Sequence, residues 1–271
     1  MTTMQPTTTQ SLVGSQRARP VYTGVAAFGL LLIALAPALM LTIAMATGQS
    51  GDDTLFFLIM AGLPAVTAAL VWRFGTWAKL LGAVVSVLAV LGLFWIAFGL
   101  AFPASFGDFT PGVIFPLGVV LGLGGSIAAL VQGRRGNLRT EATTAERRIV
   151  AGALGLVGLA AVTSAGLWMV NRTAVDTGVA ATTATMSDFA FAEDAYEVAA
   201  GDTLAVHNAD GFVHDFTVRE LGIAANVLPG EDALLAVPNE PGTYTVYCTL
   251  HSDPEATDAS DGDMVTTLIV N

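Results

Sequence analysis

Cysteine, histidine and charged residues are scarce in this sequence. Cys248 is the single cysteine among 271 residues, and there are three histidines. A lone cysteine excludes an internal disulfide framework, so its thiol is either a liability to oxidation or a ligand. Charged residues make up 12% of the chain against 54% hydrophobic residues, and the mean hydropathy is +0.66. This composition excludes an ordinary soluble globular protein.

The few charges are unevenly distributed. Of the 22 acidic residues, 17 lie from Asp176 onward, where Arg219 is the one basic residue. This part therefore carries a net charge of about −16, whereas the part before it has 10 basic and 5 acidic residues. Such asymmetry indicates that the two parts of the chain lie in different surroundings.

Five apolar segments precede Asp176, each near the roughly 20 residues that cross a bilayer core. They lie at about 21–46, 54–72, 79–102, 111–132 and 149–170. The first is too long for the apolar core of a signal peptide, so a spanning helix is predicted instead of a cleaved leader. The sequence thus predicts a cytoplasmic tail over 1–20 and a membrane α-helical bundle of five transmembrane helices over 21–170.

The basic residues predict the orientation of these helices. Arg17 and Arg19 precede the first segment, and further basic residues occupy the loops from the second to the third and from the fourth to the fifth segment. The alternate loops carry acidic residues alone. The positive-inside rule therefore predicts a multi-pass protein of the cytoplasmic membrane, with the N-terminus inside and the C-terminal part outside.

The middle of each apolar segment is free of Asp, Glu, Lys, Arg and His. Intramembrane charges usually mark proton relays or ion paths, and haem-binding spans need axial ligands such as His. A pump, a proton-coupled transporter or a membrane cytochrome is therefore disfavoured. A packing and anchoring bundle is the favoured interpretation.

Short alternating segments replace the long apolar runs from Met186 onward. Apolar and polar residues alternate at 203–208, 214–219, 243–248 and 264–270, and turn residues such as Gly and Pro separate these segments. The pattern predicts a small β-sandwich or barrel. Before it, the polar stretch 171–183 is predicted to be a linker, which leaves 184–271 as an extracytoplasmic all-β domain.

Four side chains of this domain form a candidate metal site. His214 begins one predicted strand, Cys248 ends another, and His251 follows in the next loop, while Met264 opens the last apolar segment. A thiolate, two imidazoles and a weak axial thioether are the ligands of a mononuclear blue-copper site. Three polar residues are candidates to orient these ligands through hydrogen bonds: Asn208, Asp215 and Thr249.

Other metal chemistries fit the residues less well. Structural zinc usually takes more thiolates or a different spacing of His and Cys, although zinc remains an alternative. A dinuclear copper centre needs a second cysteine, and a substrate-reducing copper enzyme needs further histidines. His207 is the one histidine left over, and it is expected at a surface strand position. The sequence therefore predicts a carrier and not an enzyme.

The segments 200–203, 206–210, 213–216 and 242–251 resemble the cupredoxins, the plastocyanin- and azurin-like blue copper proteins. The resemblance covers about 184–271 and implies a Greek-key sandwich that binds one type 1 copper ion. It implies that His214, Cys248 and His251 are the equatorial ligands and that Met264 is the axial ligand. Twelve residues separate His251 from Met264, more than is usual in the family. An open axial position or an oxygen donor therefore remains an alternative.

Together these features predict a membrane-tethered type 1 (blue) copper protein that transfers single electrons between redox partners on the outer side of the membrane. The strongly acidic domain would be steered toward a protein partner with a basic docking surface, although acidity could equally reflect high salt. The lipid bilayer is the second expected partner, and no nucleic acid is expected. The alternative is a copper-handling or copper-sensing membrane protein whose β-domain captures copper ions.

Overall fold

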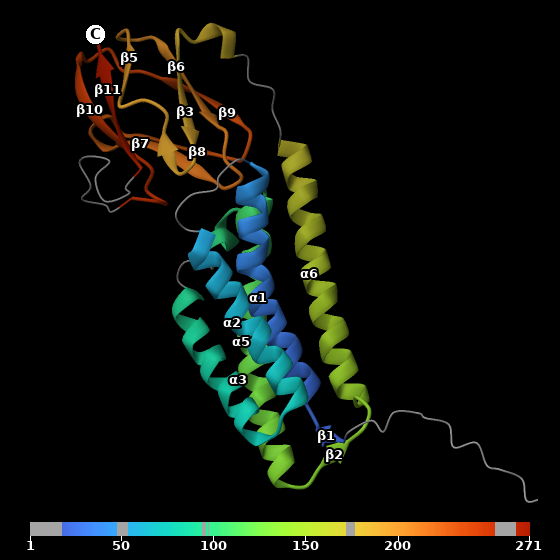
Figure 1. Cartoon of the computed structure of the whole chain (residues 1–271). Helices are drawn as coiled ribbons and strands as arrows, with labels where there is room; N and C mark the ends of the chain where they lie inside the picture. The colour runs from blue at the N-terminus through green and yellow to red at the C-terminus, as the bar shows by residue number, and fades with distance from the viewer. Residues whose placement is uncertain (1–17, 48–53, 94–95, 97, 172–176, 253–263) are drawn as a thin grey trace, which may run out of the picture.

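The chain folds into a helical bundle with a β-sandwich seated on one of its ends (Figure 1). The structure is a computed structural model, and it describes residues 18–47, 54–93, 96, 98–171, 177–252 and 264–271. Most of the predicted tail, residues 172–176 of the predicted linker and nearly all of the acidic insert before Met264 lie outside the described residues.

The described residues of the bundle form five α-helices. They are α1 (Thr23–Ala46), α2 (Thr54–Arg73), α3 (Thr76–Ala89), α5 (Phe106–Arg134) and α6 (Thr144–Asn171). All but α3 are long and apolar enough to cross a membrane, which confirms the predicted apolar helices for four of the five segments. Leucine, isoleucine and alanine side chains of α1 pack against α2, α3 and α5 in a shared core, whereas α6 is the least covered of the long helices.

The third predicted segment, 79–102, departs from a single continuous helix. Its α-helix begins three residues earlier, at Thr76, and ends at Ala89. Two 3-10 turns follow, η1 (Val90–Gly92) and η2 (Phe98–Ala101). A Cβ atom at Gly99 would lie 2.2 Å from the backbone oxygen of Asp108, so η2 is pressed against the start of α5. Five crossings therefore remain a prediction.

Two long helices begin five residues before their predicted apolar segments. Helix α6 begins at Thr144 because Thr143 and Glu146 form a capping box. In it, the Glu146 carboxylate accepts the Thr143 N–H (2.8 Å) and the Thr143 hydroxyl accepts the Glu146 N–H (3.2 Å). Helix α5 begins at Phe106, which places Asp108 in a buried first turn and not in the loop where the sequence pattern placed it.

A two-stranded pairing closes the end of the bundle that lies away from the sandwich (Figure 1). Strand β1 (Arg19–Pro20) pairs with β2 (Leu138–Arg139) just before α1 and between α5 and α6. The Arg19 guanidinium lies 4.0 Å from the centre of the Trp72 ring, a cation–π contact. Arg19 and its strand partner Arg139 therefore lie at the same end of the bundle, and the orientation of the chain in a membrane stays a prediction.

In the part of the domain that the structure describes, nine strands form the two sheets of a sandwich. They are β3 (Thr182–Ser187), β4 (Ala190–Phe191), β5 (Ala195–Val198), β6 (Thr203–Asn208), β7 (His214–Val218), β8 (Ile223–Val227), β9 (Asp232–Ala236), β10 (Gly242–Tyr247) and β11 (Val265–Val270). One sheet has the order β5-β11-β10-β7-β8 and the other β4-β3-β6-β9. The predicted all-β domain is confirmed; its Greek-key connection stays a prediction. The first strand begins two residues inside the predicted linker.

The core of the sandwich follows the alternation seen in the sequence. Leu204 and Val206 of one sheet face Phe216, Val246 and Leu268 of the other in one buried cluster. Successive side chains of a strand point to opposite faces, so the polar residues between these positions point away from the core. Strand β7 is the exception, because all five of its residues are buried. Both faces of the strand that begins with His214 are thus covered.

Candidate metal centre

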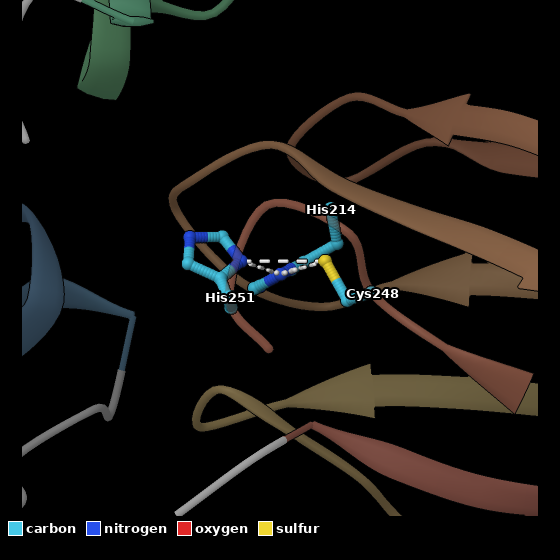
Figure 2. A group of neighbouring side chains, drawn as sticks. All are labelled: His214, Cys248 and His251. Atoms are coloured by element: carbon cyan, nitrogen blue, oxygen red, sulfur yellow. Dashed lines mark hydrogen bonds between the residues drawn. The ribbon is translucent and has the colours of Figure 1, made fainter. Parts of the chain in front are cut away.

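His214, Cys248 and His251 meet at one end of the sandwich (Figure 2). His214 is the first residue of β7, and Cys248 directly follows β10, its neighbour in the sheet. The His251 N–H donates to the carbonyl oxygen of Cys248 at 3.2 Å, and this turn brings the imidazole back over the thiol. The sequence prediction of three residues meeting at strand–loop junctions is therefore reproduced by the fold.

The three donor atoms face one another. Nδ1 of His214 lies 3.0 Å from Nδ1 of His251, and Sγ of Cys248 lies 3.8 and 3.4 Å from these two nitrogens, respectively. His214 and Cys248 are fully buried, and His251 is partly buried. No other group of three His, Cys, Asp or Glu side chains among the described residues has this proximity. Two ring nitrogens and one sulfur thus converge on a single point.

Met264 lies beside this group despite the long insert before it. Its carbonyl oxygen accepts the Cys248 N–H at 3.0 Å and the Ser252 hydroxyl at 2.9 Å. Its side chain is 1% exposed and belongs to the same hydrophobic cluster as Cys248. The fold therefore returns Met264 to the site, and its role as the axial ligand stays a prediction.

Asp210 orients the His214 ring, and sequence reasoning missed it. Its carboxylate lies 2.6 Å from Nε2 of His214, and both side chains are buried. Burial opposes ionisation of Asp210, but the contact with His214 and the N–H groups of Phe189 and Asp188 together outweigh it and hold the pKa of the carboxyl below its usual value. An ionised carboxylate only accepts hydrogen bonds, so Nε2 carries the proton and Nδ1 keeps its lone pair for a ligand. In the sequence, the four-residue spacing between Asp210 and His214 was the feature that could have indicated this contact.

The same carboxylate holds a strained turn above the site. Asp188 and Phe189 connect β3 to β4 with φ angles of 55°, a left-handed conformation that is uncommon outside glycine. Their N–H groups donate to Asp210 at 2.7 and 3.1 Å. The Phe189 ring then stands edge-on to His214 and His251, with ring centres 5.5 and 5.0 Å away. Backbone strain of this kind is concentrated at functional sites.

Of the three residues predicted to orient ligands, Asp215 contacts a predicted ligand directly, whereas Asn208 and Thr249 contact residues around the site. The Asp215 N–H points at the Cys248 sulfur at 3.4 Å, and the Thr249 hydroxyl donates to the Asp215 carboxylate at 3.0 Å. The Asn208 side-chain amide donates to the carbonyl oxygens of Phe212 and Val227. Asn208 thereby braces the loop that ends at His214.

Burial governs the protonation of Cys248 and His251 in the folded chain. It raises the pKa of the Cys248 thiol to about 12, with a further contribution from the Asp215 carboxylate, whose oxygen lies 3.2 Å from the sulfur. Burial also lowers the pKa of His251 to about 3, helped by the neighbouring His214. A metal must therefore displace a thiol proton, whereas the His251 imidazole is already neutral and able to bind.

Comparison with known proteins agrees with this geometry. Residues 159–257 match the model of the Cupredoxin-like domain, a range that includes His214, Cys248 and His251 and ends before Met264. The chain carries a C-terminal cupredoxin-like domain. No curated protein matches the chain.

Several solved structures are similar to the cupredoxin-like domain. A point mutant of amicyanin in its Cu(I) form is 17% identical over 36% of this chain and 87% of that chain, with a TM-score of 0.28. A purple cupredoxin from Nitrosopumilus maritimus is 17% identical over 30% and 82%, with a TM-score of 0.24. A copper-containing nitrite reductase from Thermus scotoductus SA-01 is 19% identical over 33% of this chain, with a TM-score of 0.26. The match spans 22% of that reductase.

The donor set of the cupredoxin-like domain fits a copper ion. Thiolate and imidazole suit copper in both of its common oxidation states, whereas carboxylate and carbonyl oxygen suit harder ions. The Asp210 contact leaves the Nδ1 atom of His214 free to coordinate, and Nδ1 of His251 faces the same sulfur. The domain and its cluster therefore support copper as the cofactor, as the sequence predicted.

His207, the remaining histidine, lies outside the cluster. Its Nδ1 is 2.8 Å from the Asp232 carboxylate across the β6–β9 ladder, and its side chain is 37% exposed. This is the surface strand position expected from the sequence.

Proposed function

We propose that the chain is a membrane-tethered type 1 copper protein that transfers single electrons between redox partners on the outer side of the cytoplasmic membrane. The observation that carries the proposal is the convergence of His214, Cys248 and His251 in a buried pocket of a cupredoxin-like domain. These three residues would hold the ion equatorially and Met264 axially. Such a copper ion supplies one-electron exchange between Cu(II) and Cu(I).

The chain itself contributes a rigid set of donors. Asp210 holds the His214 ring and the turn at 188–189, and Asn208 braces the loop between them. Ligands that are held in place before the metal binds change little between oxidation states, and small rearrangement favours fast electron transfer. This rigidity favours an electron carrier that keeps its copper ion. It disfavours a copper-handling protein that captures the ion and releases it.

The helical bundle supports the membrane part of the proposal. Four helices of the described chain are long and apolar enough to span a membrane, and we assign the fifth crossing to α3 and the turns that follow it. Arg19 and Arg139 pair at the end away from the sandwich, which supports a cytoplasmic N-terminus and an outer copper domain. The proposed division is a tail over 1–20, a transmembrane region over 21–170, a linker over 171–183 and the copper domain over 184–271.

The remaining residues favour a carrier with protein partners over an enzyme. A second copper site for substrate reduction would need histidines, and His207 is instead paired with Asp232. The net charge of about −16 from Asp176 onward would steer the domain toward a basic docking surface. Met45, Met60 and Met169 are 61%, 40% and 66% exposed on the surface of the bundle. A copper path through the bundle would instead need thioether side chains that face its interior.

The test is the visible absorption and EPR spectrum of the full chain in detergent after addition of Cu(II). Type 1 coordination produces an intense thiolate-to-copper band, which must disappear in Cys248→Ser and persist in the matched control His207→Gln. A wild-type chain that binds Cu(II) without this band would refute the proposal.

A second measurement separates the carrier from the copper-handling alternative. A carrier cycles reversibly between oxidation states and retains its metal in the presence of a competing chelator. Rapid loss of Cu(I) to the chelator from a chain that shows the band would favour copper capture and delivery instead.

A further inference from the structure

Asp108 is a buried carboxylate at the start of an otherwise apolar helix. It lies in the first turn of α5, and its side chain is 4% exposed. Its Oδ2 atom accepts the hydroxyl of Ser105 and, at 2.8 Å, the backbone N–H of Val213 in the sandwich. Val213 directly precedes His214. A side chain of the helical bundle therefore holds the backbone next to a predicted copper ligand.

Close packing surrounds this contact. A Cβ atom at Gly107 would lie 2.2 Å from the carbonyl oxygen of Gly211, and one at Gly211 would lie 2.5 Å from a methyl group of Ile43. The two glycines thus let the loop before His214 fit between α1 and α5, where the sandwich meets the bundle (Figure 1). Movement of this loop relative to the helices would break the contact.

The other histidine of the site also contacts the bundle. The Phe98 ring of η2 stands edge-on to His251, with ring centres 6.5 Å apart. η2 itself is pressed against α5 at Asp108, because Gly99 approaches the Asp108 backbone. The end of the sandwich that holds the ligands therefore faces the helices.

We propose that Asp108 is a positioning residue of the copper centre: by accepting the Val213 N–H it fixes the loop that carries His214. The helical bundle is then part of the scaffold of the site as well as its anchor. This inference rests on the proposed function. The physical reason is that the Val213 amide is buried, so removal of its acceptor leaves a donor without water or a partner and lets the loop relax.

The experiment compares full-length variants in detergent, each loaded with Cu(II). Asp108→Ala removes the acceptor, Asp108→Asn keeps an oxygen that can accept the same N–H, and Ser105→Ala removes only the hydroxyl that restrains the carboxylate. Glu146→Ala is the matched control, because Glu146 is a buried carboxylate that caps backbone N–H groups at the opposite end of the bundle. EPR parameters and the rate of copper release to a chelator are measured for each.

We expect Asp108→Ala to keep the thiolate band, to change its EPR parameters and to release copper about tenfold faster, a factor that corresponds to one lost buried hydrogen bond. Ser105→Ala should change the EPR parameters and the rate of copper release in the same direction, but by a smaller amount. The separate variant Asp108→Asn should retain most of the wild-type behaviour. Glu146→Ala should match the wild type in both readouts.

Each outcome separates the inference from the proposed function. A wild-type chain without the thiolate band refutes the proposed function and, with it, the inference. A wild-type chain with the band, together with Asp108→Ala and Ser105→Ala variants that share its spectrum and release rate, overturns the inference alone. If Asp108→Ala does not fold, a Ser105→Ala variant with wild-type readouts still overturns it.

Discussion

Asp210 accepts a hydrogen bond from Nε2 of His214 at 2.6 Å, and the same carboxylate accepts the N–H groups of the left-handed turn at Asp188 and Phe189. One buried side chain thus sets the tautomer of a predicted ligand and holds an aromatic ring against both histidines. Residues that hydrogen-bond to a metal ligand orient it, and their mutation typically lowers metal affinity.

Asp210→Asn should weaken copper binding by about 10- to 100-fold, the usual effect of losing an outer hydrogen-bond partner. An amide offers one acceptor oxygen where the carboxylate offers two, so either the turn or His214 loses its partner. Competition with a chelator of known affinity measures the change in the full chain. The control is Asp232→Asn, which removes a similar carboxylate–histidine pair on the partly exposed β6–β9 ladder. An equal loss in both variants would contradict the role given to Asp210.

Met264→Leu should keep the thiolate band and raise the reduction potential. The substitution conserves volume at a buried position, so the fold should tolerate it. It replaces a weak donor by an apolar group, which disfavours the more highly charged Cu(II) relative to Cu(I). A spectroelectrochemical titration of both proteins measures the shift. An unchanged potential would indicate that Met264 is not the axial ligand.

The convergence of His214, Cys248 and His251 was largely predictable because residues of these types are rare in the chain and occur in a characteristic order. Cys248 and the two histidines occur at strand–loop junctions, and alternation in the flanking segments indicates which face each occupies. Met264 was harder to place, because a long insert separates it from His251 and only the fold shows that its backbone pairs with Cys248. The four long apolar helices followed from length and hydropathy alone.

Contacts between distant segments could not be predicted from local patterns. The hydrogen bond from Val213 to Asp108 joins residues that are 105 positions apart, and the sequence pattern placed Asp108 in a loop between two apolar segments. Asp210 was missed for a related reason: a carboxylate in a turn is usually solvated, and only the fold shows that this one is buried against His214. The start of α6 also lies outside its apolar segment, because the polar cap formed by Thr143 and Glu146 extends the helix beyond its apolar core.

Gly107→Ala should loosen the junction between the bundle and the sandwich. The added Cβ atom would lie 2.2 Å from the Gly211 carbonyl oxygen, a backbone atom that cannot move without displacing its loop. Overpacking of this kind costs about 1–3 kcal/mol. Faster copper release and greater proteolysis at the junction should both be observed. Gly152→Ala in α6 is the control, since a Cβ atom there meets nothing within 4 Å. Wild-type behaviour of Gly107→Ala would contradict the close packing.

Acid should destabilise the metal-free cupredoxin-like domain through His251. Burial holds the pKa of this imidazole near about 3 in the folded chain, against the ordinary value of 6.5 for a free side chain. Between these two values the unfolded state binds a proton that the folded state does not, so folding stability falls as the pH drops below about 6.5. The loss of folding stability continues toward pH 3. It is absent at neutral pH, where the His251 ring is neutral in both the folded and the unfolded state.

Pulse alkylation of Cys248 measures this effect in the intact chain. The thiol is unique and buried, so the fraction that reacts in a short pulse reports the unfolded population of the domain at each urea concentration. The urea midpoint of the metal-free wild type should fall between about pH 7 and about pH 5, a range that crosses the ordinary titration of histidine. His251→Asn should show a smaller fall, because it removes the titrating group. His207→Asn should retain the full fall, and equal pH dependence in wild type and His251→Asn would exclude His251 as its source.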